Sequence, residues 1–273
     1  MRDAMTERFE NLFARLAQRR EGAFVPFVNL CDPDPETSLA VLETLVASGA
    51  DALELGIPFS DGPVVEASAD RALANGATPA RCLDVLRRFR TAHPETPVCL
   101  MLYINLVATP GVRRFMQAAA DAGADAVLIP DLPTSMREAE PEWDEAAREA
   151  GLHLVAIVPP NASDERVARI AGLTSGYTYL LSRVGITGTD HASGTPAERI
   201  IRDLERAKAP PTLLGFGIST PGHVRRALEA GAAGVIVGSA LVKIVSEHLG
   251  DRDAMLKALG SAAASFKAAT RTA

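Results

Sequence analysis

Short runs of consecutive apolar residues alternate with amphipathic segments along the chain. Eight runs have the length of a strand, at 23–28, 52–55, 98–102, 126–129, 154–157, 177–181, 212–214 and 235–237. Such continuous hydrophobicity is typical of strands that are buried on both faces in a parallel sheet covered by helices. Before the first run, four apolar residues follow the i, i+3, i+4, i+7 spacing of one helix face: Phe9, Leu12, Phe13 and Leu16. The pattern predicts an extra N-terminal helix followed by eight strands.

The segments between the strands carry recognisable helix ends. Three begin with a capping side chain followed by proline, at Asp34-Pro35, Thr78-Pro79 and Thr220-Pro221. Four end in a glycine that can take the left-handed conformation and turn the chain toward the next strand: Gly49, Gly123, Gly151 and Gly231. Each strand is therefore expected to be followed by a helix of its own.

Eight strand–helix units in about 250 residues fit an α/β fold of the (β/α)8, or TIM-barrel, class. The rival is an open doubly wound sheet, but its fingerprint G-x-G-x-x-G is absent after the first strand. No linker, low-complexity tract or block of like charge divides the chain. We therefore expect a single barrel domain over residues 1–273.

Composition narrows the choice of partners. Among 273 residues there are 28 Lys and Arg against 34 Asp and Glu, a net charge of −6, which argues against a nucleic-acid partner. The longest apolar stretch, 98–108, is too short to cross a membrane. The N-terminus has no apolar signal core, and Cys31, Cys82 and Cys99 form no Cys-x-x-Cys pair, so a reduced cytoplasm is expected. The histidines are scattered, so no metal is expected.

Two carboxylates stand where a barrel carries its chemistry. Glu54 interrupts the apolar run 52–55, so its side chain is expected inside the barrel, where burial raises its pKa toward neutrality and suits it to proton transfer. Asp61 follows in a loop just past that strand and can serve as the second carboxylate. The alternatives are a structural carboxylate with a buried partner for Glu54 and an ordinary Asx-turn for Asp61.

Two glycine-rich segments predict an anion site. Residues 215–219 follow the seventh strand and residues 238–240 follow the eighth, which is the usual place of a phosphate in a barrel. The alternative is that these glycines serve only to form tight turns. The long polar segment 183–195 is expected to be a mobile lid over that ligand, or else merely a disordered loop. Tyr103, at a strand end, can line the pocket or simply pack.

Four segments resemble the signature sequences of one known family, the α subunit of tryptophan synthase, in its order and approximate spacing. They are Gly22-Ala23-Phe24-Val25-Pro26-Phe27-Val28, the run from Gly49 through Glu54 to Ser60, Gly176-Tyr177-Thr178-Tyr179-Leu180-Leu181-Ser182-Arg183 and Gly215-Phe216-Gly217-Ile218-Ser219. The resemblance covers essentially the whole chain. It implies cleavage of indole-3-glycerol phosphate to indole and glyceraldehyde 3-phosphate, with no cofactor on this subunit.

The resemblance also implies roles for individual residues. Glu54 matches the family's catalytic glutamate, and Tyr179 matches a tyrosine that lines the site. The phosphate contacts fall on Gly188, Gly217, Gly238 and Ser239. In this reaction Glu54 moves protons at the indole ring and the glycerol hydroxyl, while an ionised Asp61 binds the indole N–H. A wall of Phe27, Leu102 and Leu128 would hold the flat ring.

One departure from the family concerns the loop of the second carboxylate. The family usually reads Asp-Pro-Leu-Ala-Asp-Gly-Pro after Phe-Ser, but here Ser60 runs directly into Asp61-Gly62-Pro63, four residues short. Asp61 aligns with the catalytic aspartate or with the first aspartate of the family loop. Because the family uses this loop to meet a β subunit, that partnership is expected to be weakened. The alternatives are a diverged paralogue and a catalytically impaired subunit that binds the phosphate ligand and acts as an allosteric partner of a β subunit.

Overall fold

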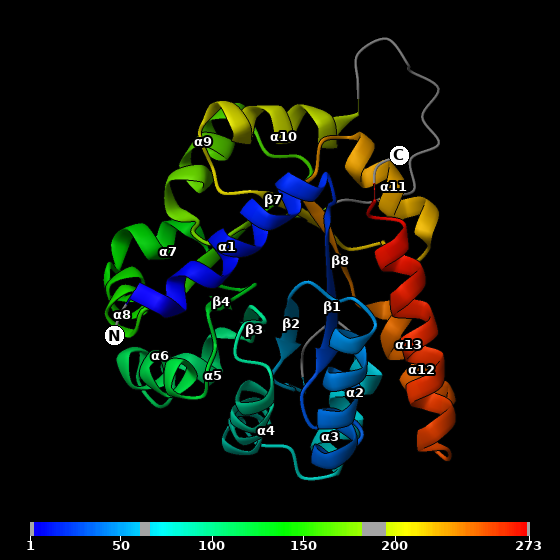
Figure 1. Cartoon of the computed structure of the whole chain (residues 1–273). Helices are drawn as coiled ribbons and strands as arrows, with labels where there is room; N and C mark the ends of the chain where they lie inside the picture. Colours follow the sequence, from blue (N-terminus) through cyan, green and yellow to red (C-terminus); the bar gives the residue numbers. More distant parts are fainter. Residues whose placement is uncertain (1–2, 61–65, 182–194, 272–273) are drawn as a thin grey trace.

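The computed structural model describes residues 3–60, 66–181 and 195–271, and in them eight parallel strands close into a barrel in sequence order (Figure 1). The strands are β1 (Ala23–Asn29), β2 (Leu53–Gly56), β3 (Val98–Met101), β4 (Ala126–Leu128), β5 (His153–Val158), β6 (Thr178–Leu181), β7 (Thr212–Gly215) and β8 (Gly234–Val237). β1 pairs with β8 as well as with β2, so the sheet has no free edge. The predicted TIM-barrel class is confirmed.

Helices precede, separate and follow the strands along the chain. They are α1 (Asp3–Arg19), α2 (Pro35–Ala47), α3 (Glu66–Ala74), α4 (Pro79–Ala92), α5 (Ile104–Ala108), α6 (Val112–Asp121), α7 (Thr134–Ala139), α8 (Glu142–Ala150), α9 (Asp164–Leu173), α10 (Pro196–Arg206), α11 (Pro221–Glu229), α12 (Ser239–Glu247) and α13 (Arg252–Ala268). No helix among the described residues is long and apolar enough to cross a membrane.

The predicted helix ends are confirmed in detail. The side chains of Asp34, Thr78 and Thr220 each accept a hydrogen bond from a backbone N–H in the first turn of α2, α4 and α11. The four glycines singled out at helix ends all have positive φ: Gly49, Gly123, Gly151 and Gly231. The local signals in the sequence therefore place these helices correctly.

Alternation along the strands divides the apolar core in two. Residues that face outward, such as Leu53, Leu55 and Leu100, form a large cluster with the surrounding helices. Residues that face inward form a smaller cluster within the barrel, which includes Ala52 and Cys99. We call these the outer and the inner cluster.

The predicted N-terminal helix is present as α1, and its apolar face belongs to the inner cluster. Phe9, Leu12 and Leu16 are buried, and Phe13 packs against them. The Phe9 ring lies 5.4 Å from the ring of Tyr177, centroid to centroid, at the start of β6. α1 therefore lies across the end of the barrel from which the strands start, and it closes that end (Figure 1).

The C-terminal residues meet the start of β1. The backbone N–H of Gly22 donates to the carbonyl of Thr270 over 2.8 Å, and Glu21 bridges to Arg271. Lys267 on α13 binds both Glu21 and Asp51, and the Asp51 carboxylate in turn accepts the backbone N–H of Phe24. The last helix thus fastens the first strand.

Candidate active site

Glu54 is a carboxylate that lies among the apolar side chains of the inner cluster. Its neighbours Leu53 and Leu55 face outward, so its side chain faces the barrel interior, where it is 1% exposed. Its Oε1 accepts a hydrogen bond from the Tyr177 hydroxyl over 2.9 Å. Backbone pairing places it beside Phe27 on β1 and Cys99 on β3. The expected inward carboxylate is therefore present at mid-barrel.

Burial sets the proton affinity of Glu54. Removal from water raises the pKa of the carboxyl from 4.5 to about 7, while the hydrogen bond from Tyr177 acts in the opposite direction. No cation contributes. A carboxyl with a pKa near 7 is present in both protonation states at neutral pH, so the same group can donate and accept a proton.

Tyr177 is the partner that sequence reasoning missed. It is completely buried between Glu54 and the Phe9 ring of α1. Burial raises the pKa of its hydroxyl well above 10, with the charges of Cys99 and Glu54 acting in the same direction, so it serves Glu54 as a hydrogen-bond donor. The available signal was its spacing of two residues from Tyr179, which puts both rings on one face of the strand.

Tyr179 also faces the interior, one step closer to the open end of the barrel. It is buried, and its pKa is raised well above 10 by desolvation and by the charge of Glu54. Its ring lies against the backbone of Gly215, where an added Cβ would meet the hydroxyl at 2.1 Å. Gly215 is therefore required at the end of β7, because a side chain there would displace Tyr179.

The predicted ring wall is only partly assembled from the expected residues. Phe27 and Leu128 both belong to the inner cluster. Leu102 belongs to the outer cluster, and the residue of that segment that packs with the inner cluster is Met101. Since side chains of a strand alternate between faces, the one-residue difference reverses the direction of the side chain. Met101 therefore joins Phe27 and Leu128 as a candidate wall residue, whereas the placement of Leu102 does not fit that role.

Glycines make room for the Phe27 ring. A Cβ at Gly56 would lie 2.9 Å from Phe27 Cζ, and one at Gly238 would lie 3.3 Å from Phe27 Cδ1. Phe27 thus fills the space between the end of β2 and the start of α12. Phe27 is therefore adjacent both to Glu54, through strand pairing, and to Gly238 of the predicted phosphate site.

The two helices after β7 and β8 begin differently. The side chain of Thr220 caps α11 by accepting the backbone N–H of His223. The residue before α12, Gly238, has no side chain to cap it, and no other side chain in the described part of the chain caps its first N–H groups, so they are available to an outside acceptor. Ser239 is exposed there. The start of α12 is therefore the better anion site of the two.

Gly217 contributes a turn rather than a helix end. Its φ of +85° and the φ of +69° at Phe216 put two successive residues in the left-handed region, and the Phe216 side chain is 60% exposed. The Gly217 carbonyl is bound by His223 Nδ1 over 2.9 Å. The loop after β7 is thus held in a turned conformation at the same end of the barrel as Gly238.

Tyr103 lies half-buried at the end of β3, as expected for a residue at the rim. Its ring is 5.2 Å from that of Phe59, which follows β2. The backbone N–H of the next residue, Ile104, donates to Asp131 over 2.9 Å. These contacts join the segments after β2, β3 and β4 at the rim of the barrel.

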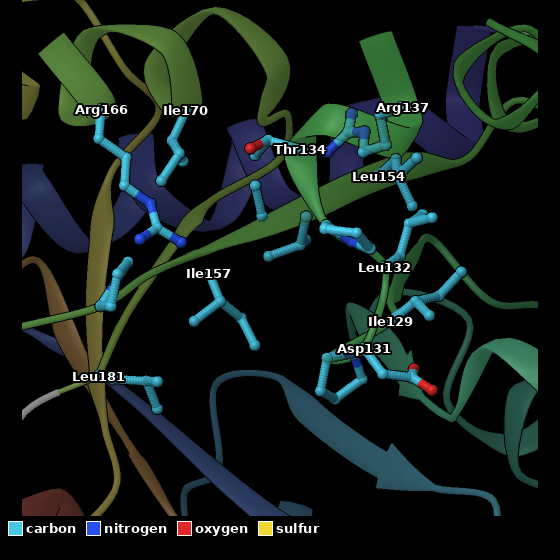
Figure 2. A pocket seen from close by; sticks show the side chains of 15 residues that line it. Ile129, Asp131, Leu132, Thr134, Arg137, Leu154, Ile157, Arg166, Ile170 and Leu181 are labelled. Atoms are coloured by element: carbon cyan, nitrogen blue, oxygen red, sulfur yellow. The ribbon is translucent and has the colours of Figure 1, made fainter. Parts of the chain in front are cut away.

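A cavity of about 360 Å³ opens beside the ends of β4, β5 and β6. On the barrel side Ile157 and Leu181 line it, and on the far side Arg166 and Ile170 reach in from α9 (Figure 2). Ile157 and Leu181 pack with the inner cluster, whereas Ile170 belongs to the outer cluster. The cavity therefore leads from the interior of the barrel outward past β5.

Some predicted site residues lie outside the part of the chain that the structure describes. They are Asp61, Gly188 and the segment 183–194 of the expected lid; only Thr195 is described, as the cap of α10. Within the described residues no group of three His, Cys, Asp or Glu side chains could hold a metal ion.

Comparisons with known proteins agree on one family. A family model described as tryptophan synthase alpha chain matches residues 13–271. The chain is 50% identical over 269 residues to the tryptophan synthase alpha chain of Photobacterium profundum, spanning 97% of this chain and 99% of that protein. The alpha chain structure from Legionella pneumophila has 32% identity and a TM-score of 0.85, covering 96% and 97%. A chain in the tryptophan synthase α2β2 complex of Pyrococcus furiosus has 37% identity and a TM-score of 0.79, covering 90% and 98%.

Proposed function

Because the chain belongs to the tryptophan synthase alpha chain family, we propose that it cleaves indole-3-glycerol phosphate to indole and glyceraldehyde 3-phosphate. This is a retro-aldol reaction of a carbon–carbon lyase, and the chain needs no cofactor for it. The observation that carries the proposal is Glu54, a carboxyl buried inside the barrel with a pKa of about 7 and no cation beside it among the described residues.

The proton movements of the reaction match this carboxyl. Breaking the bond between indole C3 and the glycerol carbon requires a proton delivered to C3 and a proton removed from the adjacent hydroxyl. At neutral pH Glu54 can deliver the first proton in its acid form and take the second in its carboxylate form. Tyr177 holds the carboxyl in place through Oε1, and Oε2 is the oxygen proposed to reach the substrate. Glu54 is therefore the proposed general acid and base.

The position of Phe27 indicates where the indole ring and the phosphate of the substrate bind. The flat ring is proposed to lie against Phe27, Met101 and Leu128, with Tyr179 at its edge and Tyr103 at the rim. The phosphate is proposed to bind the open N–H groups at Gly238 and Ser239, together with Gly217 and Gly188. Asp61 is proposed to bind the indole N–H, which acquires positive charge during cleavage.

A substitution at the phosphate site tests this arrangement. Gly238 has a φ of −112°, outside the left-handed region, and the atoms nearest to an added Cβ belong to Phe27, the closest at 3.3 Å. Gly238→Val is expected to stay folded and to raise the KM for indole-3-glycerol phosphate far more than it lowers kcat. Gly172→Val on α9, where an added Cβ meets nothing within 4 Å, is the matched control. An unchanged KM in Gly238→Val would contradict the phosphate placement.

Turnover by the isolated chain tests the activity itself. The purified chain is expected to release indole from indole-3-glycerol phosphate, detected by the absorbance or fluorescence of free indole. Release of glyceraldehyde 3-phosphate in equal amount confirms that the carbon–carbon bond is the one broken. Ligand binding without indole release would favour the alternative of an impaired subunit that serves as an allosteric partner.

We also propose a β subunit as partner, with a weakened response. The Pyrococcus furiosus relative is described as part of a mutually activated α2β2 complex. In this chain, the loop through which the family meets the β subunit is four residues short. Titrating a family-typical β subunit into the indole assay is expected to stimulate this chain less than an α subunit with the full loop. Equal stimulation would show that the four residues are dispensable. The proposed location is the cytoplasm, with neither a membrane nor a nucleic acid as partner.

A further inference from the structure

Two of the three cysteines lie side by side in the outer cluster. Cys31, in the connection from β1 to α2, is 1% exposed, and Cys82, in the first turns of α4, is 0% exposed. Their Sγ atoms are 3.7 Å apart, with the Cys82 thiol donating to Cys31. The third cysteine, Cys99, is buried in the inner cluster and hydrogen-bonds only within its own segment and toward Tyr177. The chain thus contains one thiol pair and one separate thiol.

The backbone at Cys31 is strained. Its φ is +63°, in the left-handed region that favours glycine and costs stability for a residue with a side chain. The conformation is held by the hydrogen bond from the Cys31 N–H to Ser38 Oγ at 3.0 Å. A strained residue whose side chain meets a second thiol suggests that the thiol itself has a use.

The two thiols are not equivalent. The hydrogen bond from Cys82 lowers the pKa of Cys31, and the positive charge of Arg81 acts in the same direction. The same contact and burial raise the pKa of Cys82 far above its usual range. Cys31 is therefore the one to form a thiolate, which is the nucleophilic form of cysteine, while Cys82 stays a thiol beside it.

We propose that Cys31 and Cys82 are a reversible oxidation site, a dithiol that a hydroperoxide converts to a disulfide. The Cys31 thiolate attacks one peroxide oxygen and breaks the O–O bond; with a proton this gives a sulfenic acid and one molecule of water or alcohol. Cys82 then attacks the Cys31 sulfur while its thiol proton passes to the leaving hydroxyl; the S–S bond forms, the S–O bond breaks, and the sulfenic oxygen leaves as water. Two thiols are oxidised by two electrons while one peroxide is reduced.

Closing the disulfide must move the segment that carries Cys31. The sulfurs have to approach from 3.7 Å to about 2.05 Å. The next residue, Asp32, is buried and binds both Ser68 and Arg71 on α3, while Ser68 also accepts a hydrogen bond from Asn29 at the end of β1. α3 begins directly after residues 61–65. Oxidation therefore disturbs the contacts that hold α3 against the end of β1, and it is expected to lower lyase activity several-fold.

Peptide mapping of the native protein tests the covalent step. The full chain is treated with a small excess of hydrogen peroxide, the remaining thiols are alkylated, and the peptides are analysed by mass spectrometry. A cross-linked Cys31–Cys82 peptide that is two hydrogens lighter than its components, and that dithiothreitol separates, is expected. Cys99 is the internal control and should remain alkylated as a free thiol. Absence of the cross-link, or equal oxidation of Cys99 as in an unfolded chain, would overturn the proposal.

Two variants separate the roles of the thiols. Cys82→Ala keeps the nucleophile but removes its partner, so peroxide should leave a sulfenic acid at Cys31 that dimedone traps. Cys31→Gly suits the left-handed backbone and should give a folded protein with no cross-link. If peroxide lowers the lyase activity of the native chain and of Cys31→Gly equally, the coupling to α3 is wrong. The mass measurement does not depend on the lyase reaction, so it remains decisive if the proposed function fails.

Discussion

Two of the buried carboxylates, Asp125 and Glu54, differ in what surrounds them. Asp125, just before β4, is completely buried but is bound by Arg8 of α1 at 2.5 Å and Arg90 of α4 at 2.9 Å, and it accepts the backbone N–H of Val98. Glu54 is equally buried, and within the described part of the chain the one hydrogen bond it receives comes from the Tyr177 hydroxyl. Burial raises the pKa of both carboxyls, but at Asp125 the two arginines oppose it.

The difference follows the two ends of the barrel. Asp125 lies where the strands begin, at the end that α1 closes, and its charge is neutralised by ion pairs that join three segments of the chain. Glu54 lies further along the strands, toward the loops that carry the catalytic residues of TIM barrels. An uncompensated buried carboxyl is costly to the fold and useful to the reaction, whereas a compensated one contributes to stability alone.

The largest expected effect is on turnover, from Glu54→Gln. An amide of the same shape can still accept the Tyr177 hydrogen bond but cannot transfer a proton, so kcat should fall by roughly 10² to 10⁴. Steady-state indole release measures it, with circular dichroism as the check on folding. Glu36→Gln, at an exposed carboxylate paired with Arg88, is the matched control and should keep full activity. Near-normal turnover in Glu54→Gln would show that Glu54 is not the general acid and base.

Asp125→Asn should lower the stability of the fold and leave turnover unchanged. It leaves Arg8 and Arg90, which are mostly buried, without a counter-charge, and breaking such a pair costs roughly 3–5 kcal/mol in the free energy of unfolding. Urea denaturation measures this loss. At temperatures where the variant is folded, its kcat should equal that of the native chain. A large loss of kcat at unchanged stability would show that the two carboxylates do not differ in the way described.

A third effect is the pH dependence of stability. Because the pKa of Glu54 rises from 4.5 to about 7 on folding, the folded state binds its proton more tightly, and the native chain loses stability as pH rises from about 4.5 through 7. The full cost is about 3 kcal/mol. Glu54→Gln lacks this titration. Its free energy of unfolding relative to the native chain should therefore increase by that amount between pH 4.5 and 8. If the difference in the free energy of unfolding between the two proteins did not change with pH, the pKa of Glu54 would not be raised by burial.

The smallest effect concerns Tyr177→Phe. The hydroxyl lowers the pKa of Glu54, so its removal should raise that pKa above 7. A net hydrogen bond of about 1 kcal/mol corresponds to roughly half to one pH unit. The limb of the kcat/KM profile that reports Glu54 should move to higher pH by this amount. Tyr179→Phe is the control, since Tyr179 makes no hydrogen bond to Glu54, and its limb should stay in place.

Features with a local cause could be predicted from the sequence. The eight apolar runs became the eight strands, and the capping residues and glycines marked the helix ends where the structure has them. The exception is Thr195, which was assigned to the long polar segment. It carries the same threonine–proline signal as Thr78, and with Glu198 it forms a capping box at the start of α10. Its position at the end of a polar stretch hid the signal.

The site could be predicted only where one residue contradicts its surroundings. Glu54 is a carboxylate in an apolar run, and that conflict pointed to its place and its raised pKa. Leu102 and Met101 are both apolar, so the sequence could not tell which faces the interior; the pairing register decides it. Tyr177 donates to Glu54, 123 positions away in the sequence; its spacing from Tyr179 indicates a shared strand face but not this distant partner.

The fastening of β1 by the end of the chain has a consequence during synthesis. β1 ends at residue 29, whereas β8, its second neighbour, begins at residue 234, and α13 follows later still. At typical rates of translation, roughly ten to forty seconds separate their emergence from the ribosome. For that interval β1 has one unpaired edge, which can pair with another nascent chain. The edge of β1 is therefore protected only once β8 has been made and the barrel has closed. Faster elongation would shorten this interval, and a bound chaperone would cover the unpaired edge.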